Sequence, residues 1–308
     1  MKTKISGIHH ITALASKPQN NYDFYSKILG LRLVKKTVNF DAPDVYHFYF
    51  GDALGTPGSI ITFFPFPNAV RGKRGTGEIN KVIFRTPKNS SEYWINRLER
   101  YDVPLDKSNP TIINFLDPDG LLIEIREEEF DGASTYWKEN PVPEEFAISN
   151  IYGAGMVVDD LRKSKEFLTG ILGLTEVEEG DNLNHVKLKA ESGNQFLELV
   201  EKRGIQGAVT SAGSVHHIAW RTADIEEQKT WKKRIEEAGI STTQILDRRY
   251  FSSIYFREPG NVLFEIATDG PGFLDDEDEN SLGKKLKLPS WFEERRQMIE
   301  SVLPEFRQ

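Results

Sequence analysis

The chain has 308 residues, enough for two domains of ordinary size, and its 38% hydrophobic and 28% charged residues are typical of a globular protein. A formal net charge of -8 without a basic patch argues against nucleic acid or an anionic membrane as a partner. The chain contains no cysteine, which excludes disulfides, thiolate metal ligands and cysteine nucleophiles.

The first predicted strand, at 7–14, contains the sequence Ile8-His9-His10-Ile11. No apolar signal region precedes it and no apolar run is long enough to span a bilayer, so we expect a cytoplasmic protein without a membrane partner. A near copy, Val215-His216-His217-Ile218, returns about two hundred residues later, and the two doublets hold four of the six histidines. Because successive side chains of a strand point to opposite faces, one histidine of each doublet can face inward while its neighbour faces outward.

A unit of one strand, one helix and three more strands is predicted at the start of the chain. Its helix spans about 20–29, and its later strands span 32–40, 46–50 and 59–64. The same order recurs, as expected for an internal repeat. The matching segments are 24–31 with 167–174, 80–86 with 216–222, and the turn at 117–120 with that at 258–261.

These matches predict an α+β protein made of four βαβββ modules. We expect the modules over 1–66, 77–128, 147–202 and 213–268, followed by a loop and a short helix over 269–308. Ser290 has capping-box spacing at the start of that last helix. Its apolar residues are expected to pack on the body of the protein or on a second subunit; they are Ile299, Val302 and Leu303.

Four βαβββ units with His-His-Ile-Thr in the first strand resemble the vicinal oxygen chelate superfamily. This superfamily includes glyoxalase I, bleomycin-resistance proteins and extradiol ring-cleaving dioxygenases. Within it, the chain is most similar to the hydroquinone-type ring-cleaving dioxygenases, on the basis of residues 29–40, residues 46–52 and the second histidine doublet. The resemblance implies that pairs of modules form two open barrel-like domains, and that one of them surrounds a metal.

The resemblance also implies that the metal ligands come from fixed positions in the first and fourth strands of the modules. In chain order, the internal matches place these positions at His10 and Thr62, Lys81 and Glu124, Gly153 and Glu198, and His217 and Glu265. Pairing module one with module four joins His10, His217 and Glu265, a set that suits Fe(II) and leaves positions open for substrate and O₂. The other pairings place a lysine beside the metal or supply fewer than two histidines. We therefore expect modules one and four to pair, and modules two and three to pair.

The family pattern makes the second histidine of each doublet the ligand. His9 and His216 are then candidates to hydrogen-bond the substrate or relay a proton, the alternative being solvent-exposed strand histidines. The resemblance implies that Tyr255 contacts a substrate hydroxyl, the alternative being core packing. Arg248 is a further candidate, the alternative being a solvated loop charge. Thr12, two residues along the strand from His10, is expected to face the pocket.

The expected function is that of an extradiol-type, Fe(II)-dependent dioxygenase that opens a hydroquinone- or catechol-like ring in aromatic detoxification. Its expected partners are a small aromatic substrate and O₂, and self-association into a homo-oligomer is left open. One alternative is a glyoxalase-like isomerase or transferase, which would need a second carboxylate where Thr62 stands. The other is a metal-free binding protein, which would not need two histidine doublets. His47 and His185 are interpreted as surface or packing residues.

Overall fold

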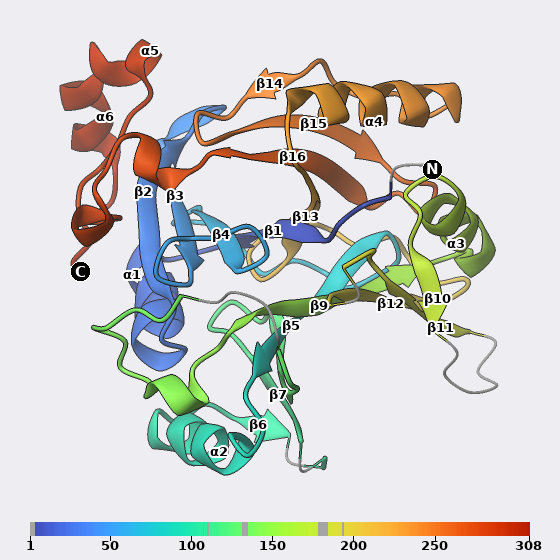
Figure 1. Ribbon diagram of the computed structural model, residues 1–308. Coiled ribbons are helices and arrows are strands. Elements are labelled where there is room, and N and C mark those ends of the chain that lie inside the picture. The colour runs from blue at the N-terminus through green and yellow to red at the C-terminus, as the bar shows by residue number, and fades with distance from the viewer. Residues whose placement is uncertain (1–3, 107, 110, 131–134, 178–183, 193) are drawn as a thin grey trace.

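The computed structural model describes residues 4–106, 108–109, 111–130, 135–177, 184–192 and 194–308. Its strands form two curled eight-stranded sheets, and each sheet consists of two four-stranded halves from different modules (Figure 1). We call the sheet from modules one and four the outer-module sheet. Its strands, in spatial order, are β14 (Leu246–Asp247), β15 (Phe251–Arg257), β16 (Leu263–Pro271), β13 (Val215–Thr222), β1 (Ile8–Ala15), β4 (Ile60–Pro65), β3 (Ala42–Gly51) and β2 (Arg32–Asn39).

The second sheet, from modules two and three, is called the inner-module sheet. Its strands, in spatial order, are β10 (Thr175–Val177), β11 (His185–Lys189), β12 (Phe196–Glu201), β9 (Asn150–Val158), β5 (Glu78–Thr86), β8 (Leu122–Glu127), β7 (Ile112–Leu116) and β6 (Leu105–Asp106). In each module the first strand runs parallel to the fourth, and two first strands meet antiparallel at the centre of each sheet. The expected α+β fold and the non-sequential pairing of the modules are thereby confirmed.

One main helix follows the first strand of each module, and a pair of short helices follows the last strand, near the C-terminus. The helices are α1 (Pro18–Tyr22) with the π-helix η1 (Asp23–Ile28), α2 (Ser91–Arg100), α3 (Leu161–Gly170), α4 (Ile225–Glu237), α5 (Ser290–Glu293) and α6 (Arg296–Val302), with 3-10 turns η2 (Glu144–Phe146), η3 (Phe273–Asp275) and η4 (Glu279–Ser281). None of the helices in the described part of the chain combines the length and the apolar character needed to cross a membrane. The π-helix replaces the end of the regular helix expected at 20–29.

Modules one and two, and likewise modules three and four, stay in contact through their helices although the members of each pair belong to different sheets. The guanidinium of Arg97 in α2 donates to the carbonyl oxygens of Lys27 and Ile28 at the end of η1. In the second half, the guanidinium of Arg234 in α4 donates to the carbonyl oxygen of Gly170 at the end of α3. Cations are favourable at a helix C-terminus, where the last carbonyl groups lack intrahelical partners.

A continuous apolar core lies between the two sheets and under the helices. Its largest members include the buried rings of Trp94, Trp220 and Trp231, from α2, β13 and α4. Burying a large apolar side chain stabilises a fold by roughly 1.5–3 kcal/mol. The central strands of the two sheets contact each other here, so the core fixes one sheet against the other.

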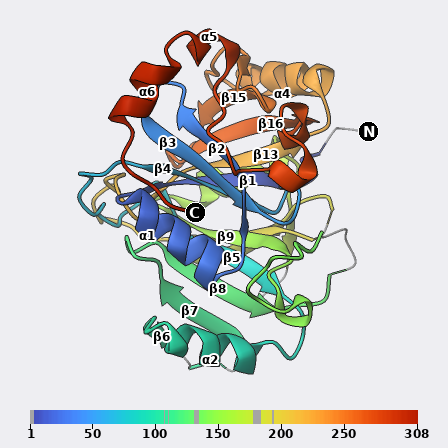
Figure 2. The same cartoon turned by 90° about the vertical axis from the view of Figure 1, so that its left-hand side faces the viewer.

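The C-terminal segment covers the β2 edge of the outer-module sheet, and Figures 1 and 2 show α5 and α6 beside β2 and β3. Phe292 and Ile299 join Val38 of β2 in a small apolar cluster of their own. Ile299 is 1% exposed, whereas Val302 is 55% exposed. The expected single helix is wrong: α5 ends before α6 begins, and Pro289, not Ser290, occupies the N-cap position of α5.

Candidate metal centre

The two histidine doublets lie beside each other at the centre of the outer-module sheet, where β1 and β13 pair. Thr12 is opposite His217 and His10 is opposite Ala219. The pairing shifts register at His9 and again at His216, so each first histidine is the extra residue of a β-bulge. A bulge bends the strand and redirects side chains. The expectation that the first histidine simply faces away from the second is therefore wrong.

Each first histidine holds the ring of the second. The Nδ1 atoms of His9 and His10 are 2.9 Å apart, and those of His216 and His217 are 2.7 Å apart. A hydrogen bond at this position requires a proton between the two nitrogens. A proton on Nδ1 of the second histidine leaves its Nε2 atom with the lone pair that a metal needs.

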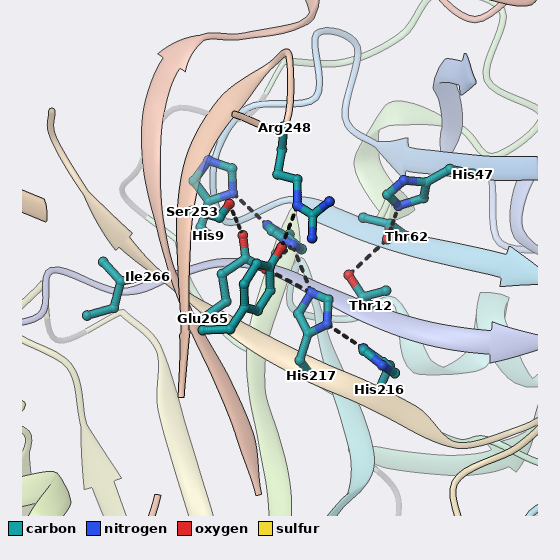
Figure 3. A network of polar contacts seen from close by, with 12 residues as sticks. His9, Thr12, His47, Thr62, His216, His217, Arg248, Ser253, Glu265 and Ile266 are labelled. Atoms are coloured by element: carbon teal, nitrogen blue, oxygen red, sulfur yellow. Dashed lines mark hydrogen bonds and ion pairs between the residues drawn. The ribbon is translucent and has the colours of Figure 1, made fainter. Parts of the chain in front are cut away.

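The Nε2 atoms of His10 and His217 converge on one oxygen of Glu265 in β16, and the side chains of His217 and Glu265 are labelled in Figure 3. Oε2 of Glu265 is 2.9 Å from Nε2 of His217 and 3.4 Å from Nε2 of His10, and the two nitrogens are 3.4 Å apart. Candidate ligand atoms of the three residues all lie within 4.8 Å of one another. The structure therefore brings together the three residues predicted as ligands, from strands at opposite ends of the chain.

Glu265 is completely buried, and its two oxygens have different surroundings. Oε1 accepts a short hydrogen bond from the hydroxyl of Ser253, whereas Oε2 is buried without a hydrogen-bond partner in the described structure. Burial acts to raise the pKa of this carboxyl, but His10 and His217, when their imidazoles hold protons on Nε2, outweigh it and hold the pKa well below its usual range. A buried, ionised oxygen facing two imidazole nitrogens needs a cation, so the residues present fit a divalent metal.

A cavity of about 400 Å³ opens above this cluster. Its walls are largely aromatic, with polar groups at the metal end and at the mouth. The lining residues are His10, Thr12, Leu14, Asn39, Phe40, Asp41, His47, Tyr49, Phe64, Phe66, His216, His217, Arg248, Phe251, Tyr255 and Leu263. A larger cavity beside α5 and α6 contains none of the predicted site residues.

Tyr255 and Arg248 form one wall of this cavity. Tyr255 lies opposite Glu265 in the sheet, and its ring centroid is 5.5 Å from that of His217. Nε of Arg248 is 3.3 Å from the hydroxyl of Tyr255, while Nη1 of the same guanidinium is 3.3 Å from Oδ2 of Asp41 at the cavity mouth. Burial raises the pKa of Tyr255, so the hydroxyl keeps its proton at neutral pH.

The remaining candidates take different places. Thr12 lines the cavity, and its hydroxyl accepts a hydrogen bond from that of Thr62. His216 also lines the cavity and is exposed to it, whereas His9 is buried behind His10 and packs against the ring of Phe251.

Sequence reasoning missed two residues of the opposite wall, His47 and Tyr49. Both lie in β3 and both line the cavity, so His47, interpreted from the sequence as a surface or packing residue, also faces the candidate site. His185, by contrast, lies in β11 of the other sheet. The alternation in β3 could have revealed the pair, because residues 47 and 49 share one face of the strand while Phe48 and Phe50 point into the core.

Comparison with known proteins is consistent with this geometry. The family model of the Glyoxalase/Bleomycin resistance protein/Dioxygenase superfamily matches residues 7–125 and 151–266. The chain is 43% identical to MhqO of Bacillus subtilis (strain 168), which is provisionally named a ring-cleaving dioxygenase, across 99% of this chain and 98% of that protein. It is 32% identical to the chlorohydroquinone/hydroquinone 1,2-dioxygenase of Sphingobium indicum, across 92% of each chain.

A solved structure gives the same result for the whole fold. The crystal structure of a provisionally assigned dioxygenase from Bacillus subtilis superimposes with a TM-score of 0.94 at 41% identity and covers 99% of both chains. The matched modules, the long relatives and the fold agree. The chain belongs to the Glyoxalase/Bleomycin resistance protein/Dioxygenase superfamily.

Proposed function

We propose that this protein is an Fe(II)-dependent dioxygenase that cleaves the ring of a hydroquinone- or catechol-like compound. The observation that supports it most directly is the cluster of His10, His217 and Glu265 at the floor of an aromatic-walled cavity. Two imidazoles and one carboxylate are the ligand set of non-haem iron oxygenases, and they leave metal positions open towards the cavity. The names of the relatives from Bacillus subtilis and Sphingobium indicum point to the same reaction class.

In this proposal His10, His217 and Glu265 hold the iron, and His9 and His216 fix the rings of the two histidines. The bound metal would supply a Lewis acid that lowers the pKa of a phenol and a site at which ring and O₂ meet. The side chains of Phe64, Phe66 and Phe251 pack around the ring and exclude water.

The polar wall residues handle charge and protons. Arg248 and Tyr255 can donate hydrogen bonds to a phenolic oxygen that carries negative charge, since one is a cation and the other keeps its proton. The imidazole of His216, exposed to the cavity, can hold or release a proton beside the ring, and the hydroxyl of Thr12 lies on the same floor.

Thr62 argues against a glyoxalase-like isomerase. It occupies the place in module one that Glu265 occupies in module four, since Thr62 pairs with Tyr49 in the sheet as Glu265 pairs with Tyr255. Its hydroxyl is bonded to His47 and Thr12 and offers no second carboxylate to the metal.

The decisive experiment is purification without air, followed by iron analysis and oxygen uptake with a set of hydroquinones and catechols. We expect about one iron per chain and uptake that depends on both iron and substrate. Glu265→Gln is the matched control, because it keeps the shape and the acceptor for Ser253 but removes the charged ligand, so it should fold without retaining iron. Iron retained by this variant, or no uptake with the iron-loaded wild type, would contradict the proposal.

The role of Tyr255 can be tested separately. Tyr255→Phe should retain iron and lose turnover by roughly 10²–10⁴-fold, the range for removing a group that transfers a proton or stabilises an oxyanion. The control is Tyr46→Phe, because the hydroxyl of Tyr46 donates to the carbonyl oxygen of Pro304, away from the cavity. An unchanged kcat in Tyr255→Phe would return this residue to a packing role.

A further inference from the structure

His47 lies in β3, on the wall of the cavity opposite Tyr255, and its ring is held there by contacts on several sides. Its Nε2 atom is 2.9 Å from the hydroxyl oxygen of Thr62. Its ring lies against those of Tyr49 and Phe64, with centroids 4.0 Å and 4.2 Å away. Figure 3 shows the hydrogen-bonded series from His47 through Thr62 to Thr12 beside the histidine and glutamate cluster, and within the described structure no hydrogen bond or ion pair joins the two groups. The ring is therefore fixed without being part of the candidate metal centre.

The positions of the protons in the hydrogen bonds from His47 through Thr62 to Thr12 determine whether Nδ1 of His47 is a donor or an acceptor towards the cavity. The hydroxyl of Thr62 donates to that of Thr12, with 3.0 Å between the oxygens. Thr62 has only one proton to donate, so it must accept from Nε2–H of His47. Burial lowers the pKa of His47 well below its usual range, so the ring is neutral and Nδ1 is left as an acceptor. Nδ1 has no hydrogen-bond partner among the described residues.

Three of the other residues that line the cavity have acceptors that are already engaged, namely Asn39, Asp41 and His216. The side-chain oxygen of Asn39 accepts from the backbone N–H of Asp41, and the carboxylate of Asp41 is paired with Arg248. Nδ1 of His216 is bonded to His217. Arg248 can only donate. The cavity thus has donors on one wall and, on the wall of β3, an imidazole nitrogen that lacks a donor.

A dihydroxylated ring in this cavity needs such an acceptor when its two hydroxyls are on opposite carbons. One phenolic oxygen faces the metal end, and the second hydroxyl points across the cavity with a proton to donate. When the two hydroxyls are on neighbouring carbons, both stay at the metal end. We propose that Nδ1 of His47 accepts the hydrogen bond of the distal hydroxyl and selects hydroquinones over catechols. This inference rests on the proposed ring-cleaving function and adds the substrate class.

Two variants of His47 and one variant of its structural counterpart, His185, test the inference. His47→Phe keeps the ring stacking and removes the acceptor, whereas His47→Asn places an amide near the position of Nδ1. The matched control is His185→Phe, because His185 occupies the position in module three that His47 occupies in module one. His47 lies two residues before Tyr49, which pairs with Thr62 in the fourth strand. His185 likewise lies two residues before Lys187, which pairs with Glu198 in the fourth strand. The control therefore changes the same strand position in the other sheet, at a residue that does not line this cavity. Each variant is purified with iron, and kcat and KM are measured for hydroquinone and for catechol.

We expect His47→Phe to keep its iron and to lose roughly tenfold to hundredfold in kcat/KM for hydroquinone, mainly through KM, as for a lost hydrogen bond in a buried site. Its kcat/KM for catechol should change by less than about threefold, because the distal acceptor is not used. His47→Asn should recover part of the loss, and His185→Phe should match the wild type. Equal losses for both rings, or no loss for hydroquinone, would overturn the role of His47 while leaving ring cleavage intact. Failure of the iron-loaded wild type to turn over either ring would overturn both.

Discussion

At the residue scale, the geometry of the candidate centre depends on hydrogen bonds behind the ligands as much as on the ligands. The Nδ1–Nδ1 contacts of 2.9 Å and 2.7 Å set the rotation of the rings of His10 and His217. They also decide which ring nitrogen is free to bind a metal. Each doublet therefore works as a pair, with the first histidine orienting the second.

This pairing predicts that His9→Ala weakens metal binding without removing a ligand. Groups that orient a metal ligand typically contribute tenfold to hundredfold in affinity, so we expect a loss of roughly that size. The measurement is competition for iron with a coloured chelator. Asn80→Ala is the control, since Asn80 is the extra residue of the equivalent bulge in the inner-module sheet. Equal affinity in His9→Ala and the wild type would show that the ring of His10 is fixed by packing alone.

The buried carboxyl of Asp117, which lies away from the candidate centre, should make the free energy of unfolding depend on pH. Burial, with the charge of Asp119 adding to it, raises the pKa of the Asp117 carboxyl from 3.8 to about 6. The folded protein thus holds this proton more tightly than the unfolded chain. The resulting stabilisation is full below about pH 4 and is lost as the pH rises through about 6.

The loss should be about 2 kcal/mol in the free energy of unfolding between about pH 4.5 and about pH 7.5. It is measured as the difference between wild type and Asp117→Asn in urea unfolding at each pH. The variant keeps an oxygen to accept the N–H groups of Asp119 and Leu121 but cannot titrate. A difference that does not vary with pH would mean that Asp117 titrates normally in the folded protein.

At the element scale, the same β-bulges occur in both sheets. The register of β5 and β9 shifts at Asn80 and at Tyr152, as the register of β1 and β13 shifts at His9 and at His216. The bulges are thus a property of the module and not of the histidines. They place the residue after each bulge, such as His10 or Lys81, towards the interior of its half-barrel.

The inner-module sheet has Lys81 at the position where the outer-module sheet has the ligand candidate His217. Nζ of Lys81 is 2.6 Å from Oε2 of Glu124 and 2.9 Å from Oε2 of Glu198, and Arg126 is paired with both glutamates. In the internal repeat, Lys81 matches His217 and Glu124 matches Glu265. The ammonium group of Lys81 therefore provides the positive charge between carboxylates that a metal would otherwise have to provide.

Removing this ammonium group should destabilise the fold. In Lys81→Met, two largely buried carboxylates lose a partner, and breaking a buried ion pair costs about 3–5 kcal/mol; the partial exposure of Lys81 places it at the low end. The measurement is urea unfolding, with iron content expected to stay at the wild-type level. Lys88→Met is the control, because its pair with Glu129 is exposed and should not change stability measurably. A Lys81→Met protein as stable as the wild type would contradict the role of Lys81.

The elements also show what the sequence could and could not predict. Internal repeats indicated the module order. Comparing the first- and fourth-strand positions at which the family resemblance places ligands singled out His10, His217 and Glu265, which the structure brings together. The bulges and the π-helix η1 were not predictable, because an irregular backbone leaves no periodic pattern in the side chains. His47 was missed because it has no histidine counterpart in module four, where the corresponding residue, Ser253, instead bonds Glu265.

At the scale of the whole molecule, the candidate centre joins the two ends of the chain, since His10 and His217 are 207 positions apart and lie in adjacent strands. A metal bound there stabilises the pairing of modules one and four according to its affinity. The inner-module sheet has its own charge cluster and does not share these ligands. The two sheets should therefore respond differently when the metal is removed.

Hydrogen exchange can measure this difference. After removal of iron by a chelator, amides of β1, β13 and β16 should exchange faster, because local opening of the outer-module sheet no longer has to break metal bonds. Amides of β5, β9 and β12 should keep their wild-type rates and act as the internal control. Equal acceleration in both sheets would mean that they open only as one unit.

The position of Lys81 also has an evolutionary consequence. A half-length chain with two modules would place its first module against the second module of another copy, and such a dimer would contain two identical sites. Joining two such chains end to end pairs module one with module four and module two with module three, as observed here. Duplication and fusion thereby release the two sites from having the same residues. One site is then free to keep His10 and its partners, while the other replaces them with Lys81 and becomes independent of any supply of metal.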